Sequence, residues 1–182
     1  MNNVEKYAGS LLISSPVCSV RDPYYRSVVL VAQHSAQGSW GMVLNRPSRR
    51  LSISDVMSSA GIESDNSEKI FLGGPVEPSR VHVVHSLDWE SESTLRVTDN
   101  IGITGDKTIL AALACNDGPK HYRVGIGLTV WVAGQIEKEV REANVKWVIS
   151  DSTLDGAFYK DGTLQWESCI NDFVNRAVSR YF

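Results

Sequence analysis

The chain has 182 residues, of which 42% are hydrophobic and 21% are charged, and this balance predicts one globular domain spanning residues 1–182 rather than a disordered chain. A net charge of -3 argues against a dedicated nucleic-acid surface, which is usually basic. No apolar run approaches the roughly 20 residues of a membrane span, and the N-terminus is a poor signal peptide, so we expect a cytoplasmic protein with no membrane segment. The three cysteines lack C-x-x-C spacing, and we expect no metal and no cofactor.

The first third of the chain reads as strands followed by one short helix. Apolar runs predict strands at residues 9–15, 28–33 and 40–44. The second and third strands form a hairpin across a five-residue connection, 35–39, and Pro47 ends the third strand. Helical periodicity follows from Ile53 to Ala60. Ser52 is a good N-cap, Asp55 suits the first turn, and Gly61 supplies the C-terminal stop.

The remainder of the chain reads as alternating strands and helices. We expect strands at 70–76, 80–86 and 93–99, the last two as neighbours, then a helix over about 104–115. Period-2 alternation predicts a strand at 121–131 with a glycine-rich second face. A helix over 133–144, with Asn144 as a left-handed cap, then precedes a strand at 146–150.

The C-terminal segment carries two conflicting patterns. Asp161-Gly162 suggests a hairpin turn, whereas an apolar stripe from Trp166 to Ala177 has helical spacing. The helical pattern is longer, so we predict a helix that starts near Thr163 as its cap.

Several motifs, in order along nearly the whole chain, resemble the YqgE/AlgH family of bacterial proteins. The most specific is H-x-x-x-G-x-x-G-x-x-x-N-R-P, carried by His34, Gly38, Gly41 and the Asn45-Arg46-Pro47 triplet. The others are GSLLISSP (9–16), DPYYRSVV (22–29), GGPV (73–76) and GQIEKE (134–139) with Trp147 after it.

The resemblance implies an α+β fold in which a mixed, mostly antiparallel and partly barrel-like sheet is flanked by helices. It also implies a role in transcriptional regulation without a defined biochemical activity. One segment departs from the family pattern. The family has Gly-Tyr-x-Gly-Trp before its Gly-Gln motif, whereas this chain has Gly127, Leu128, Thr129, Val130 and Trp131. A shared binding surface that includes this segment is therefore altered here.

The sequence offers no complete catalytic centre. His34 has no partner nearby in the sequence, and such a histidine more often bonds a backbone carbonyl. Cys115 lies at a predicted helix C-terminus, whose negative partial charge does not favour a thiolate. Cys169 reads as core and Cys18 as a loop residue. His82 and His85, three apart on a strand, point to opposite faces and do not suit one metal ion.

We therefore interpret the chain as a non-enzymatic binding or regulatory module for a small molecule or a protein partner. Functional residues concentrate on loops and element ends. The family motifs place these positions on one candidate surface: His34, Asn45, Arg46, Gly73, Gly74, Pro75, Trp131, Gln135 and Glu137.

Three alternatives stay open at this stage. The first concerns Arg46, whose guanidinium would either pair with an internal carboxylate such as Glu137 or face an anionic ligand. A hydrolase or thiol enzyme would use Cys115 or His34. A weak nucleic-acid binder would use the basic cluster of Arg46, Arg49 and Arg50.

Overall fold

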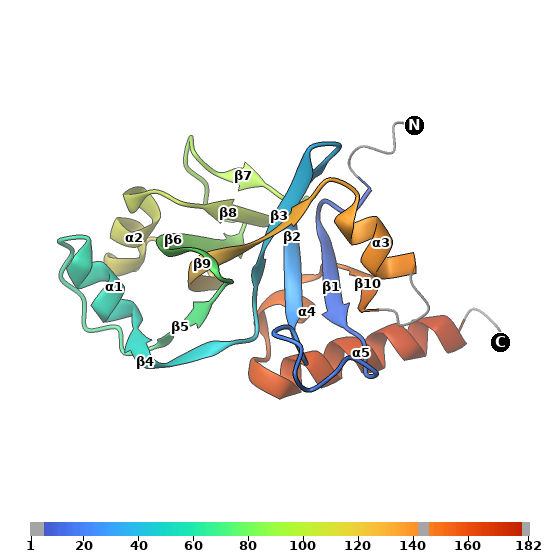
Figure 1. Ribbon diagram of the computed structural model, residues 1–182. Coiled ribbons are helices and arrows are strands. Elements are labelled where there is room, and N and C mark those ends of the chain that lie inside the picture. The colour runs from blue at the N-terminus through green and yellow to red at the C-terminus, as the bar shows by residue number, and fades with distance from the viewer. Residues whose placement is uncertain (1–5, 142–145, 180–182) are drawn as a thin grey trace.

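A computed structural model describes residues 6–141 and 146–179, which form ten strands and five helices (Figure 1). The strands are β1 (Ser10–Ser14), β2 (Val28–Ser35), β3 (Gly38–Val43), β4 (Pro47–Ser52), β5 (Lys69–Leu72), β6 (Val76–Ser86), β7 (Leu95–Arg96), β8 (Ile101–Thr104), β9 (Tyr122–Val132) and β10 (Trp147–Asp151). The helices are α1 (Ile53–Ser59), α2 (Lys107–Ala114), α3 (Gln135–Arg141), α4 (Leu154–Phe158) and α5 (Gly162–Val178).

The strands build one curled sheet. Eight follow each other in the order β10-β1-β2-β3-β9-β6-β8-β7. Off this path, β5 pairs with β9 and β4 pairs with β5. β5 runs parallel to β9, and the other described pairs are antiparallel. The predicted α+β class with a mixed, mostly antiparallel, partly barrel-like sheet and flanking helices is therefore confirmed.

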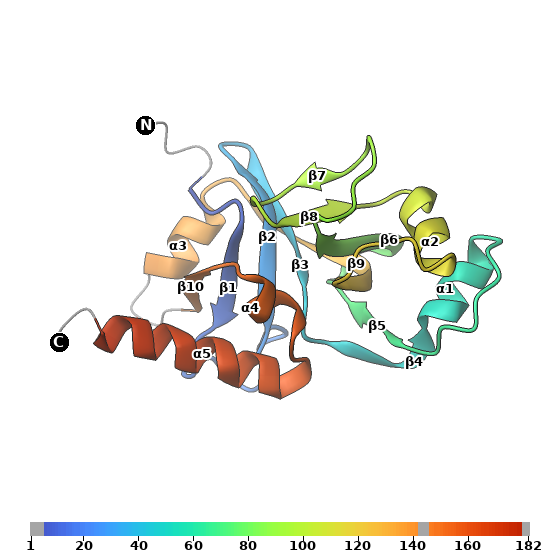
Figure 2. The same cartoon turned by 180° about the vertical axis from the view of Figure 1, so that it is seen from behind.

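The helices cover different parts of the sheet, as Figure 2 shows from behind. Alternate residues of a strand face opposite sides, so β2 contributes to two cores. Leu30 packs with Trp166 of α5 on one side, and Val31 packs with Ile136 of α3 on the other. A third core lies at the far end, where α1 and α2 pack against β5, β6 and β9.

The helix α1 confirms the expected capping. The Ser52 hydroxyl accepts from the Asp55 N–H, and the Asp55 carboxylate accepts from the Ser52 N–H at 2.7 Å, which completes a capping box. Gly61 follows the helix with φ +76, the left-handed conformation expected of a glycine stop.

The first hairpin is tighter than expected. Its connection is the two-residue turn Ala36-Gln37, not 35–39, so Ser39 is a strand residue paired with His34. β3 already ends at Val43, so Pro47 does not stop it as predicted. Pro47 instead starts β4, where it pairs with Phe71 of β5. Proline is tolerated at the first residue of a strand.

Two further expectations are wrong, and one helix was not anticipated. The strands at 80–86 and 93–99 are not direct neighbours, because β8 lies between β6 and β7. The short helix α4, capped by Thr153, was not predicted. The predicted C-terminal helix exists, but Asp161 rather than Thr163 is its N-cap, since Asp161 is the last extended residue before it. Asn144 lies outside the described residues.

Candidate functional site

Asn45 acts as an internal cross-link. Its side chain is 3% exposed, its Oδ1 accepts from the Val28 N–H at 2.9 Å, and its Nδ2 donates to the carbonyls of Arg26 (2.8 Å) and Gly162 (2.9 Å). The amide thereby ties the start of β2 to the first residue of α5. All three bonds lie within the chain, so Asn45 offers little to a ligand.

His34 makes contacts that the sequence did not indicate. It is 4% exposed, its Nε2 lies 3.2 Å from Glu137 Oε1, and its Nδ1 lies 2.7 Å from Ser39 Oγ. A carboxylate only accepts, so Nε2 donates its proton to Glu137. In the neutral imidazole, Nδ1 then accepts from the Ser39 hydroxyl. The expected bond to a backbone carbonyl is wrong. The proposed Arg46–Glu137 pair is also wrong, because the Arg46 guanidinium instead donates to the Pro23 carbonyl and the Ser27 hydroxyl.

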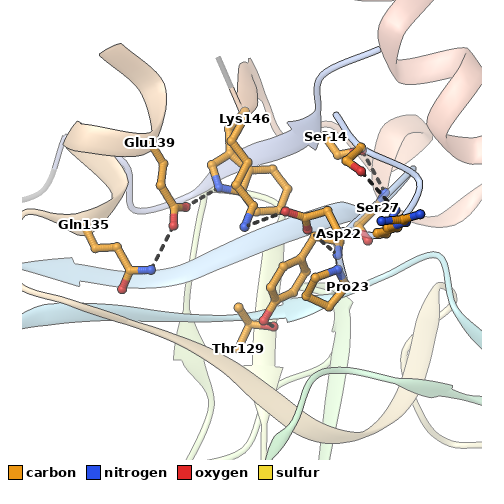
Figure 3. A network of polar contacts seen from close by, with 12 residues as sticks. Ser14, Asp22, Pro23, Ser27, Thr129, Gln135, Glu139 and Lys146 are labelled. Atoms are coloured by element: carbon orange, nitrogen blue, oxygen red, sulfur yellow. Dashed lines mark hydrogen bonds and ion pairs between the residues drawn. The ribbon is translucent and has the colours of Figure 1, made fainter. Parts of the chain in front are cut away.

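A second polar chain fastens α3 to β10. Gln135 Nε2 donates to Glu139 Oε1 at 2.8 Å, and Trp147 Nε1 donates to Glu139 Oε2 at 2.6 Å (Figure 3). Trp131 is buried, with its ring edge-on to the Trp147 ring at a centroid distance of 6.4 Å. Of the predicted site residues, Trp131 is therefore a core residue and Gln135 a link between elements.

The Gly73-Gly74-Pro75 turn crosses β9 at very short range. The Gly73 N–H donates to the Ile126 carbonyl at 2.8 Å, and the Gly73 carbonyl accepts from the Val43 N–H at 2.9 Å. A Cβ on Gly74 would collide with the backbone of Leu128 and Thr129, and a Cβ on Gly127 would collide with the Gly74 carbonyl. Glycines are needed here because two backbones touch.

Arg46, Gly74 and Pro75 come together around one cavity of about 320 Å³, which we call the Arg46 cavity. Its walls also hold Pro23, Tyr24, Val43 and Leu72. Arg46 is half-buried, and this burial lowers the pKa of its guanidinium, with the Tyr24 and Asp22 side chains acting in the opposite direction. A mostly apolar hollow with one polar group is the usual form of a small-ligand site.

The loop before β2 holds Tyr24 in the wall of this cavity. The Tyr24 N–H donates to Asp22 Oδ1 at 2.7 Å, and Asp22 Oδ2 pairs with Lys146 Nζ at 3.3 Å (Figure 3). The Tyr24 ring packs edge-on to Trp147 at 5.5 Å, and its hydroxyl donates to Thr129 Oγ1 at 3.4 Å. Sequence reasoning missed Pro23 and Tyr24, although the DPYY segment was among the family motifs.

The arginine cluster does not form one patch. Arg46 turns toward the loop before β2, where its Nη2 donates to the Pro23 carbonyl and to Ser27 Oγ at 2.8 Å. Arg49 and Arg50 are exposed on β4.

The cysteines and remaining histidines show no reactive pairing in the described parts of the chain. All three cysteines are free, and burial raises the pKa of Cys169 to about 11. Burial also raises the pKa of Cys18, and Cys115 is exposed at the C-cap of α2. Burial lowers the pKa of His82 and His85. Within the same residues, no group of three histidine, cysteine or acidic side chains could hold a metal ion.

Comparison with known proteins identifies the family. The AlgH-like family model (DUF179) matches residues 11–176. A UPF0301 protein of Xanthomonas oryzae is 36% identical over 166 residues, which cover 88% of this chain and 86% of that protein. A UPF0301 protein of Marinomonas is 31% identical over 167 residues, covering 89% and 86% of the two chains.

Two solved structures share the fold. The solution structure of AlgH from Pseudomonas aeruginosa matches with a TM-score of 0.77 and 23% identity, covering 96% of this chain and 91% of that one. A crystal structure of DIP2367 from Corynebacterium diphtheriae matches with a TM-score of 0.72 and 18% identity, covering 93% and 88%. No described helix is both long and apolar enough to cross a bilayer. The chain belongs to the AlgH-like family.

Proposed function

We propose that this protein is a cytoplasmic binding module that captures the carboxylate of a small, partly apolar ligand, or of a protein partner's side chain, in the Arg46 cavity. The observation that supports this most directly is the arginine in an otherwise apolar wall. The three free cysteines fit a reducing compartment. The regulatory role implied by the family resemblance would then follow from ligand capture.

The hydrogen bonds of Arg46 leave part of its fork for a ligand. Nη2 makes both of its bonds, to Pro23 and Ser27, while Nε and Nη1 have no partner in the described parts of the chain. Both bidentate faces of a guanidinium include Nη2, so a carboxylate in this cavity would accept a single charge-assisted hydrogen bond from Nη1 or from Nε. The apolar walls lower the local dielectric around Arg46, which strengthens such a bond.

The volume of the Arg46 cavity limits the size of its occupant. About 320 Å³ lies at the lower end of the range for small-molecule sites. The rings of Pro23, Tyr24 and Pro75 supply rigid apolar contacts that lose little conformational freedom on binding. A short organic acid or an acidic side chain with neighbouring methylenes fits these limits.

A screen of small carboxylates by ligand-observed NMR tests this proposal, followed by titration of the best binder into the native protein and two variants. We expect Arg46→Met to weaken binding at least about tenfold, since a charge-assisted bond is worth about 1.5–3 kcal/mol. Arg49→Met is the matched control, because Arg49 is exposed and outside the cavity, and should leave affinity unchanged. Equal affinity of the native protein and Arg46→Met would disprove the site.

A hydrolase is the second candidate, and one observation favours it. Ser39, His34 and Glu137 are linked in the order nucleophile, base and acid, with distances of 2.7 and 3.2 Å. Ser39 and His34 are both buried, and only Ser39 lines a cavity, one of about 560 Å³. A fluorophosphonate probe decides between the two functions. Labelling of the native protein that disappears in Ser39→Ala would support hydrolysis, and no labelling of the native protein would reject it.

A further inference from the structure

A second cavity, of about 630 Å³, lies on the other side of β5 from the Arg46 cavity. Neighbouring residues of a strand face opposite ways, so Phe71 lines this second cavity while Leu72 lines the first. We call it the Arg123 cavity. Its wall comes from β5, the start of β9, and the segment that joins α4 to α5.

Arg123 brings a buried positive charge to this cavity. The residue is 4% exposed, and its guanidinium donates to the carbonyls of Leu44, Phe158 (3.2 Å) and Lys160. It also lies 4.5 Å from the centre of the Phe71 ring. Within residues 6–141 and 146–179, no carboxylate lies at ion-pair distance from it. A buried cation without an anion is unusual, because buried charges are normally paired.

One donor of Arg123 is left over. Its Nε is buried and has no hydrogen-bond acceptor among the described residues. Burial lowers the pKa of the Arg123 guanidinium to about 10, which still leaves it charged at neutral pH. The side chain therefore retains one donor that the described residues do not satisfy, while Asp161 stabilises its charge without forming an ion pair.

The N-terminus of α5 adds a second positive element to the same wall. α5 has 17 residues, and its N-cap residue Asp161 lines the cavity without making a side-chain capping bond. The first N–H groups of a helix are free donors, and the helix dipole places positive charge there. Such helix ends bind phosphate and other anions.

Charged side chains at the rim favour an anion by a small margin. Lys69 and Lys160 join Arg123 on the positive side, and Glu68 and Asp161 are the acidic residues of the wall. Lys160 Nζ donates at 3.2 Å to Ser168 Oγ, which lies outside this wall, so the ammonium would turn its two remaining donors toward a ligand here.

Aromatic rings border the positive groups. Tyr122 and Tyr159 line the cavity, together with Phe71 and Phe158. Tyr159 is 63% exposed, and His121 stacks on Phe158 with an angle of 27° between the rings. Exposed aromatic faces next to an anion-binding helix end suit a flat ring that carries a phosphate.

We propose that the Arg123 cavity binds a small organic phosphate with a flat ring, of the nucleoside monophosphate type. Its phosphate would lie against the N-terminus of α5, Arg123 and Lys160, and its ring against Tyr159. This site is separate from the Arg46 cavity, so the two proposals stand or fall independently.

The test is an isothermal titration of the native protein with the four nucleoside monophosphates, the matching nucleosides and inorganic phosphate. We expect at least one monophosphate to bind at least about tenfold more tightly than its nucleoside and than inorganic phosphate. Binding should shift the amide resonances of Gly162, Thr163 and Leu164 in NMR spectra. Equal affinity for a nucleoside and its monophosphate would overturn the proposal, as would no saturable binding at 10 mM, roughly the weak limit of a specific site.

Two lysine variants complete the design, since Arg123 itself supports the fold. Lys160→Gln should weaken monophosphate binding about five- to tenfold. Lys120→Gln should not, because Lys120 is an exposed lysine outside the cavity wall. Far-UV circular dichroism confirms that both variants are folded. Unchanged binding in Lys160→Gln, or equal loss in both variants, would contradict the assignment of the phosphate to this wall.

Discussion

Arg46 and Arg123 lie on opposite sides of β5 and use the same side chain in two ways. Arg123 is almost fully buried and donates to three backbone carbonyls, which join the end of β3 to the segment between α4 and α5. Arg46 is half-buried, bonds one exposed carbonyl and one hydroxyl, and leaves donors toward a cavity. Arg123 therefore supports the fold in addition to lining its cavity, whereas Arg46 is available mainly for binding. A charged residue in a motif does not by itself distinguish these roles.

The largest expected effect comes from the glycine crossing beside the Arg46 cavity. Gly127→Ala puts a Cβ against the Gly74 carbonyl, at a residue with φ +75. We expect a loss of about 4 kcal/mol in the free energy of unfolding, from the left-handed backbone and the overpacking together. The urea midpoint measures this loss.

Gly61→Ala is the matched control for that crossing. Gly61 has φ +76, nearly the same value, but nothing lies within 4 Å of its added Cβ. It should lose only about 1 kcal/mol, the cost of the backbone conformation alone. Similar losses in the two variants would show that the contact between the Gly73-Gly74-Pro75 turn and β9 contributes little to stability. That contact would then not be what holds the turn in the wall of the Arg46 cavity.

The next effect tests Arg123 as a support of the fold. Arg123→Met keeps the apolar contact with Phe71 but leaves the buried Leu44 carbonyl and the half-buried Phe158 carbonyl without a donor. Each orphaned carbonyl costs about 1–3 kcal/mol, so we expect a loss of about 3 kcal/mol by urea unfolding. A stability equal to that of the native protein would show that relief of the buried charge offsets the lost bonds, and the two arginines would no longer differ.

The sequence could predict features whose partners lie close along the chain. The Ser52–Asp55 capping box spans three residues, and the β2–β3 hairpin requires only two adjacent apolar runs, so both were identified. The choice of a helix over a hairpin at the C-terminus was also correct, because a long apolar stripe is a local signal. Only the first part of that stripe is buried, since Trp166 and Cys169 are covered whereas Phe173 and Val174 are exposed.

The sequence could not predict contacts between distant segments. His34 meets Glu137 only because β9 places the start of α3 beside the β2–β3 hairpin. Arg123 reaches the Leu44 carbonyl, 79 residues away in the chain. A usable signal existed for Arg123, which shares the less apolar face of β9 with Gly125 and Gly127. Small residues there indicated a close approach of another backbone, and a charged residue among them indicated a carbonyl partner.

The smallest effect on stability should come from Arg46. In Arg46→Met, the Pro23 carbonyl lies on an exposed residue and can bond water, and the methionine side chain suits the apolar wall. The buried Ser27 hydroxyl loses its partner, which costs about 1 kcal/mol. Because an unpaired, half-buried charge is removed at the same time, we expect a change within about 1 kcal/mol by urea unfolding. This near-neutral result is what separates Arg46 from Arg123, since it leaves ligand binding as the property that depends on Arg46. A loss as large as that of Arg123→Met would instead make both arginines supports of the fold, and any loss of binding in Arg46→Met would then reflect damage to the cavity.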